Sequence, residues 1–97
     1  MNRTRFNETI HAPNRLQICA SLNSMSEIEF KALRELLDVS DSVLSKHVKV
    51  LEEAGYVNVI KRTENGRQRT WLALTKPGRQ AFRGHVDELR SLVGSNL

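Results

Sequence analysis

Apolar residues recur at three- and four-residue steps in four parts of the chain, and this spacing predicts four helices. We expect these helices at residues 12–23, 26–37, 41–54 and 76–93. Pro13 suits a first helical turn, Ser26 and Glu29 match a capping box, and Thr75 is a plausible cap for the last helix. Residues 1–11 show no clear period, so we expect a mobile arm or a helix that orders only against a partner.

Apolar and polar positions alternate between residues 57 and 74, which predicts a β-hairpin. Asn65-Gly66 favours a two-residue type I′ turn, and this turn places Arg62 opposite Arg69. One face of the hairpin then packs on the core through Val57, Val59, Leu72 and Leu74. Lys61 lies on that same side. The opposite face is cationic towards the tip, where it carries Arg62, Arg67 and Arg69.

The helix expected at residues 41–54 has an apolar stripe and a polar face. Its stripe consists of Leu44, Val48 and Leu51. Its opposite side carries Ser42, Lys46, Lys49 and Glu53. Ser40 suits the N-cap, and Gly55 supplies the left-handed residue that ends many helices.

Small polar and basic side chains on a stable helix suit the base edges and phosphates of a DNA major groove. Arginines at a hairpin tip suit phosphate or the adjacent minor groove. The candidate DNA-binding residues are Ser40, Ser42, Ser45, Lys46 and Lys49 on the helix, with Arg62, Arg67 and Arg69 on the hairpin.

The positive charge of the chain is concentrated in its middle. The net charge is +4 and the isoelectric point is near 9.7. Residues 39–79 carry eight basic and four acidic side chains, whereas the two flanking parts are balanced. An excess on the candidate helix and hairpin is the electrostatic pattern that phosphate binding requires. A basic face that is merely solvated is the alternative.

Residues that support catalysis or metal binding are sparse. The soft metal ligands are His11, His47, His85 and Cys19, which lack zinc-site spacing. No phosphate-binding loop, dinucleotide motif or catalytic triad pattern is present, so we expect neither an enzyme nor a cofactor. His47 either packs locally or touches DNA. A single cysteine and no long apolar run indicate a soluble, cytoplasmic protein of one domain, residues 1–97.

The chain resembles winged-helix transcriptional regulators of the MarR/ArsR type over residues 12–92. Around the predicted recognition helix, the similarity rests on Phe30, Leu33, Leu36-Leu37, Val39-Ser40, Leu44-Ser45-Lys46-His47-Val48, Leu51-Glu52 and Ala54-Gly55-Tyr56-Val57. In and after the hairpin, it rests on Lys61-Arg62, Thr70, Leu74-Thr75, Gly78-Arg79 and Ala81-Phe82. The paired cysteines or histidines of metal-sensing ArsR relatives are missing here.

This resemblance implies a winged helix-turn-helix, mainly α with a small β-hairpin (α+β), and N- and C-terminal helices that form a dimer. It also implies sequence-specific binding of double-stranded DNA by a homodimeric transcriptional regulator, and repression as opposed to activation. The alternative is a winged helix that binds an acidic protein and not specific DNA. A small-molecule effector, if one exists, would have to bind at the dimer interface or between the helices and the wing.

The C-terminal helix carries the pattern of a helix–helix seam. Its apolar residues recur at 4-, 3- and 4-residue steps, at Phe82, Val86, Leu89 and Val93. Phe6 and Ile10 have no obvious use within the chain and could cover a partner's helix. We therefore expect these six residues at a dimer interface. The alternative is a helix that packs only on its own domain.

Overall fold

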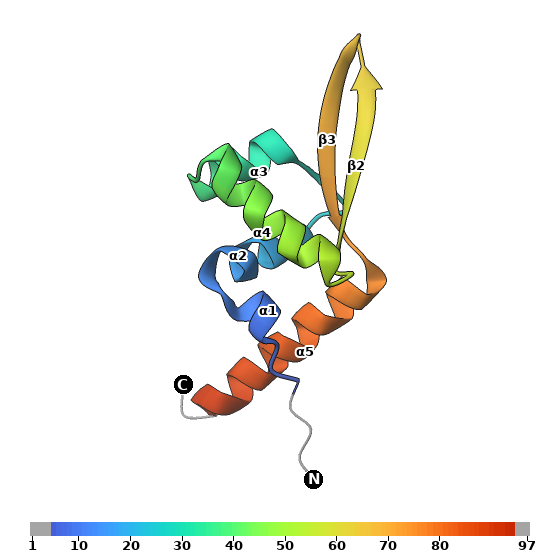
Figure 1. The fold of residues 1–97 in the computed structure, drawn as a ribbon. Coiled ribbons are helices and arrows are strands. Elements are labelled where there is room, and N and C mark those ends of the chain that lie inside the picture. The colour runs from blue at the N-terminus through green and yellow to red at the C-terminus, as the bar shows by residue number, and fades with distance from the viewer. Residues whose placement is uncertain (1–4, 95–97) are drawn as a thin grey trace.

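The computed structural model describes residues 5–94 of the 97-residue chain. In chain order its elements are α1 (Glu8–His11), α2 (Pro13–Asn23), β1 (Ile28–Glu29), α3 (Phe30–Leu37), α4 (Asp41–Glu53), β2 (Val57–Glu64), β3 (Arg67–Leu74) and α5 (Lys76–Val93). The molecule is elongated, 53 × 25 × 21 Å, because the β2–β3 hairpin projects far beyond the helices (Figure 1). Helix α5 lies at the end away from the hairpin tip. Within residues 5–94, no helix combines the length and apolar character needed to cross a membrane.

The three strands form one antiparallel sheet in the order β1-β3-β2. The register predicted for the hairpin is confirmed: Arg62 lies opposite Arg69, and Val59 lies opposite Leu72. The turn residues Asn65 and Gly66 have φ angles of 51° and 76°, as a type I′ turn requires. We call this hairpin, residues 57–74, the wing.

The expectation of a helix from residue 26 is wrong at its start. Ile28 and Glu29 form β1, which pairs with Leu72 and Trp71 of β3, and α3 begins only at Phe30. The N-cap of α3 is Glu29, and no side chain caps this helix end. Pairing with β3 satisfies the backbone of this segment and buries Ile28, which outweighs a local capping box.

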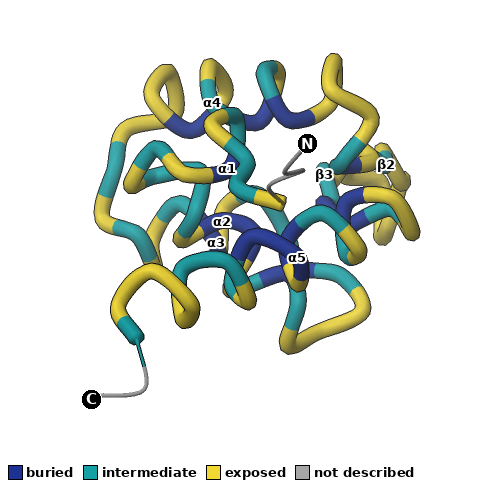
Figure 2. The backbone as a smooth tube through the Cα atoms, turned by 90° about the horizontal axis from the view of Figure 1, so that it is seen from below, coloured by how far each residue is buried: buried dark blue, intermediate teal, exposed yellow. Residues whose placement is uncertain are grey.

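The helices bury their apolar stripes against the base of the sheet. The buried apolar residues form one cluster, and Figure 2 shows them on the inner sides of the elements, with exposed residues outside. The cluster contains Ile10, Ile18, Cys19, Leu22, Ile28, Leu33, Leu44, Val48, Leu51, Val57, Leu72, Leu74 and Phe82. The predicted stripe of α4 is therefore inward, which turns its polar side to solvent.

The N-terminal segment does not match a mobile arm in its described part, residues 5–11. It forms α1, whose N-cap Asn7 accepts a hydrogen bond from the Ile10 backbone, and Ile10 is fully buried in the core. The side-chain amide of Asn7 also donates to the Tyr56 hydroxyl at 2.9 Å. Residues 1–4 of the expected arm lie outside the described residues. The core of the chain itself orders this segment.

His85 of α5 is fully buried beneath this segment. Its Nδ1 accepts a hydrogen bond from the Asn7 backbone N–H at 3.0 Å, and its Nε2 lies 3.1 Å from Nδ1 of His11. Since Nδ1 accepts, the proton of a neutral His85 ring is on Nε2 and is donated to His11. Burial is the main cause that lowers the pKa of His85, and the charge of a protonated His11 adds to it.

The junction of α4, the wing and α5 is unusually tight. Gly55, with φ of 82°, and Tyr56 end α4 with hydrogen bonds to the carbonyls of Glu52 and Leu51, which is a Schellman motif. The carbonyl of Tyr56 accepts from the Thr75 backbone. A Cβ atom on Gly78 would lie 2.1 Å from that carbonyl oxygen. Only glycine therefore allows α5 to approach this closely.

Gly78→Ala should lower the free energy of unfolding by up to about 2 kcal/mol, because overpacking against a backbone carbonyl costs roughly 1–3 kcal/mol and this contact is a close one. That cost should exceed the gain of about 1 kcal/mol that alanine has over glycine within a helix. Gly84→Ala in the same helix is the control, since the atoms nearest to its Cβ would be those of the Arg5 side chain, at 3.3 Å and beyond. Urea denaturation measures both, and equal midpoints would contradict the tight junction.

Acidification should destabilise the protein as the pH falls below about 6.5, the pKa of histidine in the unfolded chain. The pKa of His85 is lower in the folded chain than its unfolded value of about 6.5, so the unfolded state binds more protons. This stabilisation is complete above the unfolded pKa and is lost as the pH falls through the folded one. His47 has a lowered pKa and acts in the same direction.

Thermal unfolding at several pH values tests this dependence. His85→Gln cannot titrate and should show a weaker loss of stability on acidification than the wild type. Combining it with His47→Gln should reduce the loss further. A His85→Gln protein that loses stability as steeply as the wild type would show that His85 does not carry the effect.

Candidate nucleic-acid interface

Helix α4 presents a polar face that its own packing leaves open. Leu44, Val48 and Leu51 hold its inner side in the core. Exposed on the other side are Ser42, Ser45, Lys46 and Lys49. The chain thus places four of the predicted helix residues on one accessible face.

Ser40 has a structural task at the start of this helix. Its hydroxyl accepts from the Val43 backbone N–H at 3.2 Å and lies 3.2 Å from the hydroxyl of Ser42. Asp41 forms an ion pair with Arg34 of α3 at 2.8 Å. These contacts fix the start of α4 relative to α3, the two helices of the helix-turn-helix.

His47 makes the local contacts that were one of its two expected roles. Nδ1 lies 3.2 Å from an Arg15 nitrogen, and Nε2 lies 3.3 Å from the side-chain amide of Asn14. Arg15 always donates, so Nδ1 accepts from it and carries no proton, which makes the ring neutral. Burial, then the charges of Arg15 and Lys46, lower the pKa of His47. His47 therefore ties the flank of α4 to α2 as a neutral ring.

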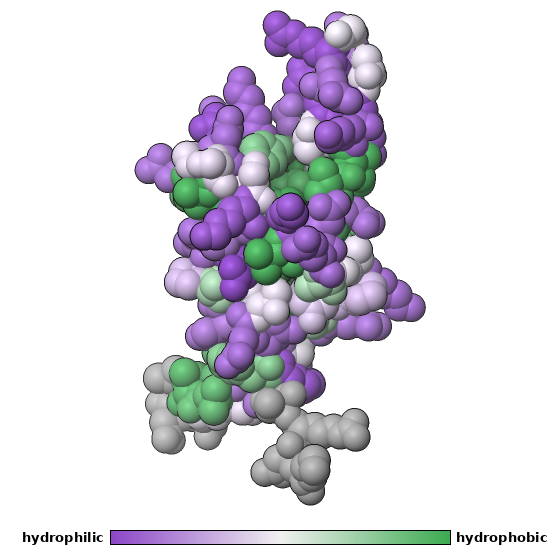
Figure 3. All heavy atoms as spheres, in the orientation of Figure 1, coloured by the Kyte–Doolittle hydropathy of each residue, from purple (hydrophilic) through white to green (hydrophobic). Residues whose placement is uncertain are grey.

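An open groove of about 370 Å³ separates α4 from the wing. Its floor is apolar, and Figure 3 shows the apolar surface between these two elements, below the hydrophilic wing tip. Its rim carries Ser45 and Lys49 from α4 and Thr70 from β3. The full lining is Phe30, Ser45, Val48, Lys49, Glu52, Val59, Thr70 and Leu72.

The two faces of the wing differ in charge and in partners. Side chains two residues apart in a strand face the same side, so Lys61 shares the face of Val59, towards the groove. Arg62 and Arg69 share the opposite face. We define the inner face by Val59, Lys61, Thr70 and Leu72, and the outer face by Ile60, Arg62, Arg69 and Trp71.

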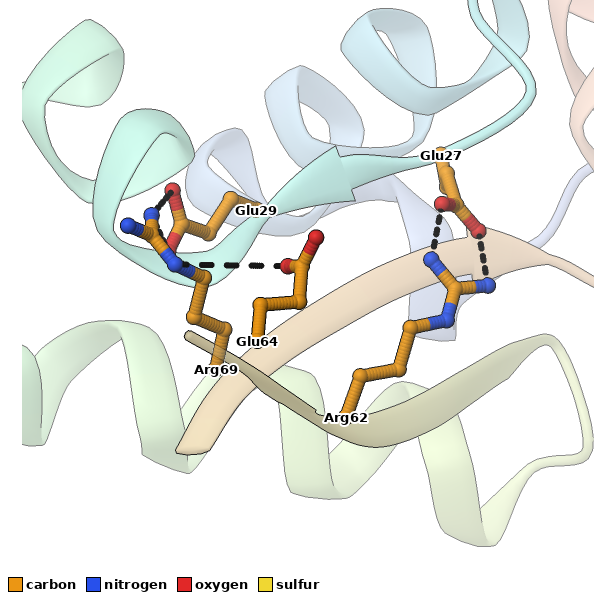
Figure 4. A network of polar contacts seen from close by, with 5 residues as sticks. All are labelled: Glu27, Glu29, Arg62, Glu64 and Arg69. Carbon is orange, nitrogen blue, oxygen red and sulfur yellow. Dashed lines mark hydrogen bonds and ion pairs between the residues drawn. The ribbon is translucent and has the colours of Figure 1, made fainter. Parts of the chain in front are cut away.

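Two of the three predicted wing arginines are already paired within the chain (Figure 4). Arg62 binds both carboxylate oxygens of Glu27, one of them at 3.0 Å. Arg69 binds Glu29 at 3.1 Å. Hydrogen bonding from Arg62 lowers the pKa of the Glu27 carboxyl. Arg62 and Arg69 are thus engaged with carboxylates of their own chain, whereas the Arg67 side chain is exposed and has no partner among residues 5–94.

The sequence analysis did not predict that Glu27 and Glu29 contact the wing. Glu27 and Glu29 alternate with Ile28, which is the period of a strand, and this signal was available. Lys61 is predicted from the sequence to lie on the core side of the hairpin, without a defined role. The register alone puts it on the inner face, beside α4.

The six residues predicted for a dimer interface fall into two groups. Ile10 and Phe82 are buried in the core of their own chain, and the Phe6 ring packs on His11 and His85 at 4.7 Å between centroids. The premise that Phe6 and Ile10 have no use within the chain is therefore wrong. The rest of the seam is more open: Val86 and Leu89 are half-buried, and Val93 is exposed.

The described residues contain no group of three or more His, Cys, Asp or Glu side chains able to hold a metal ion. Cys19 is buried, and this burial raises the pKa of its thiol to about 12. A thiol that stays protonated at neutral pH is a poor nucleophile and a poor metal ligand.

Comparison with known proteins supports the fold and the general function. The chain is 37% identical over 78 residues to an uncharacterized protein of Methanocaldococcus jannaschii, a match that covers 80% of this chain and 85% of the relative. The structure is similar to that of a transcriptional regulator homologue from Pyrococcus horikoshii, with a TM-score of 0.85 and 25% identity, over 90% of this chain and 86% of that one.

A more distant structure shows the same fold. The PcaV transcriptional regulator from Streptomyces coelicolor, solved with its natural ligand, has a TM-score of 0.74 and 19% identity. The match covers 88% of this chain and 59% of PcaV. The family model of the winged helix DNA-binding domain matches residues 14–93. The chain is therefore a member of the winged-helix DNA-binding family, a DNA-binding transcriptional regulator of MarR/ArsR type and not an enzyme.

Proposed function

We propose that the chain acts in the cytoplasm as a homodimeric repressor that binds a specific sequence of double-stranded DNA. The observation that carries this proposal is the exposed face of α4 beside the open groove, which combines serine hydroxyls with Lys46 and Lys49. Hydroxyls and amines recognise base edges, while lysine also neutralises phosphate. With α4 in the major groove, one phosphate strand would run into the groove between α4 and the wing.

The exposed apolar side chains at the C-terminal end of α5 support a homodimer. Leu92 and Val93 are 68% and 56% exposed, and half-buried Leu89 and Val86 continue this apolar strip along the helix. Figure 3 shows the apolar side chains gathered at this end of the molecule. A second copy on this strip would remove it from water and give the assembly a two-fold axis.

A two-fold assembly would place two α4 helices about one DNA turn apart, roughly 34 Å, on one face of the duplex. The preferred site would then be a palindrome. A repressor follows from this arrangement if the site overlaps a promoter, because the bound dimer occludes the DNA from polymerase.

Lys46→Ala or Lys49→Ala should each flatten the dependence of log affinity on log salt by about 0.9, the change expected when one fewer phosphate is neutralised. Ser42→Ala should change the base preferred at one position of the site, with a penalty of roughly 1–3 kcal/mol. Arg83→Ala on α5 removes the same charge far from α4 and serves as the control. Selection from a random duplex pool supplies the site, and titrations at several salt concentrations supply the slopes.

The wild type itself decides whether duplex DNA is the partner. We expect a steep salt dependence even with random duplex, because Lys46, Lys49 and Arg67 would each neutralise a phosphate. Absence of binding at low salt would refute the DNA proposal and favour a winged helix that binds an acidic protein.

Leu92→Glu should convert the dimer to a monomer without unfolding it, since the side chain is already largely exposed within its own chain. Specific binding to a palindrome should fall far more than binding to random duplex. Leu36→Glu on α3 is the matched control: Leu36 is 67% exposed, and its substitution should leave the dimer intact. Sedimentation at tens of micromolar protein measures the assembly. A wild type that is monomeric there would overturn the homodimer.

A further inference from the structure

The outer face of the wing is joined to the body of the protein by two ion pairs. Ile28 faces the core, so the side chains on either side of it, those of Glu27 and Glu29, lie on the outer face of the sheet. Arg62 on β2 and Arg69 on β3 lie directly opposite each other and reach these two carboxylates (Figure 4). Each of the two wing strands is thus held to the edge of the sheet that adjoins α3.

Contacts around these pairs make a connected network. The Arg62 guanidinium lies over the Trp71 ring, 5.7 Å from its centroid, and Trp71 is paired with Glu29 of β1. Arg69 also approaches Glu64 at 3.9 Å. Single exposed ion pairs contribute little, but two-point arginine contacts within a network are the favourable exception.

The outer wing has little else to hold its direction. All residues from 61 to 69 are exposed, and the last apolar side chains towards the tip are the paired Ile60 and Trp71. A two-stranded hairpin without an apolar face is marginally stable and free to bend. The angle between wing and α4 therefore depends on contacts at the level of Arg62 and Arg69.

Lys61 is one residue from Arg62 but on the inner face, which looks towards α4. It lies opposite Thr70, which lines the groove. An arginine that turned from Glu27 or Glu29 to a DNA phosphate would leave an unpaired carboxylate close to a polyanion. Lys61 can bind phosphate without breaking an interaction within the described residues.

We propose that Glu27 and Glu29, through Arg62 and Arg69, are positioning residues that set the angle of the wing, and that Lys61 makes the phosphate contact on the wing side of the groove. This inference rests on the proposed DNA binding for its second half. The first half concerns the free protein and can be tested without DNA.

The first measurement is backbone ¹⁵N relaxation of the free protein. Order parameters of residues 61–70 should fall in the Glu27→Gln/Glu29→Gln double variant and return towards wild-type values in the charge-swapped Glu27→Arg/Arg62→Glu variant. Those of α4 should stay the same in all three proteins. If the wing of the double variant is as ordered as that of the wild type, the positioning role is overturned.

The second measurement is affinity for the selected duplex as a function of salt. Arg62→Glu alone should weaken binding about tenfold or more, and adding Glu27→Arg should restore most of it, a non-additivity expected only of residues that interact. The control is Glu27→Arg with Arg67→Glu, which has the same net charge but no matched pair and should not be restored. Lys61→Ala should flatten the salt slope by about 0.9.

The results of these experiments distinguish a failure of the positioning role, of the Lys61 contact and of the proposed DNA binding. If Glu27→Arg does not rescue Arg62→Glu, Arg62 itself contacts DNA and the assignment to Lys61 is wrong. A Lys61→Ala protein with an unchanged salt slope refutes the phosphate contact alone. If the relaxation result is as expected but the wild type binds no duplex at low salt, the positioning role stands and the proposed function fails.

Discussion

The approach of α5 to the backbone of Tyr56 is the constraint on which the rest of the arrangement depends. At this point α4 ends and β2 begins, and the first turn of α5, which follows β3, packs against the same backbone. Gly55 allows the left-handed turn, and the carbonyl of Tyr56 accepts a hydrogen bond from Thr75. Gly78 leaves room for that carbonyl. A shift here would move α4, the wing and α5 relative to one another, and with them any surface that binds DNA or a second chain.

The N-terminal segment reinforces this junction from the side. Asn7 caps α1, its side chain donates to the Tyr56 hydroxyl, and its backbone N–H donates to Nδ1 of His85 on α5. His47 is held in a similar way, between Arg15 and Asn14 of α2. Burial lowers the pKa of both histidines in the folded protein, which favours their neutral form. The polar contacts that hold α4 and α5 against the N-terminal helices thus depend on the protonation state of His47 and His85.

The two faces of the wing have different roles. Its inner face continues the groove beside α4, and its outer face is engaged with the carboxylates of Glu27 and Glu29. The charges in the sequence do not distinguish the two roles, because Lys61 and Arg62 are adjacent and equally basic. Strand alternation separates them, since neighbouring side chains point to opposite sides.

Much of this fold could be predicted from the sequence because the signals are local. Ser40 and Gly55 bound α4 within a few residues of its core stripe, and Asn65-Gly66 sets the wing register by turn geometry. The exposed face of α4 follows from the same periodicity. The tertiary structure alone decided which partners distant residues take. Glu27 contacts Arg62 across 35 positions, Asn7 donates to His85, and Ile28 pairs with Leu72 in a strand where the sequence predicted the first turn of a helix. Burial and strand pairing depend on elements far apart in the chain, and no local spacing records which of them will meet.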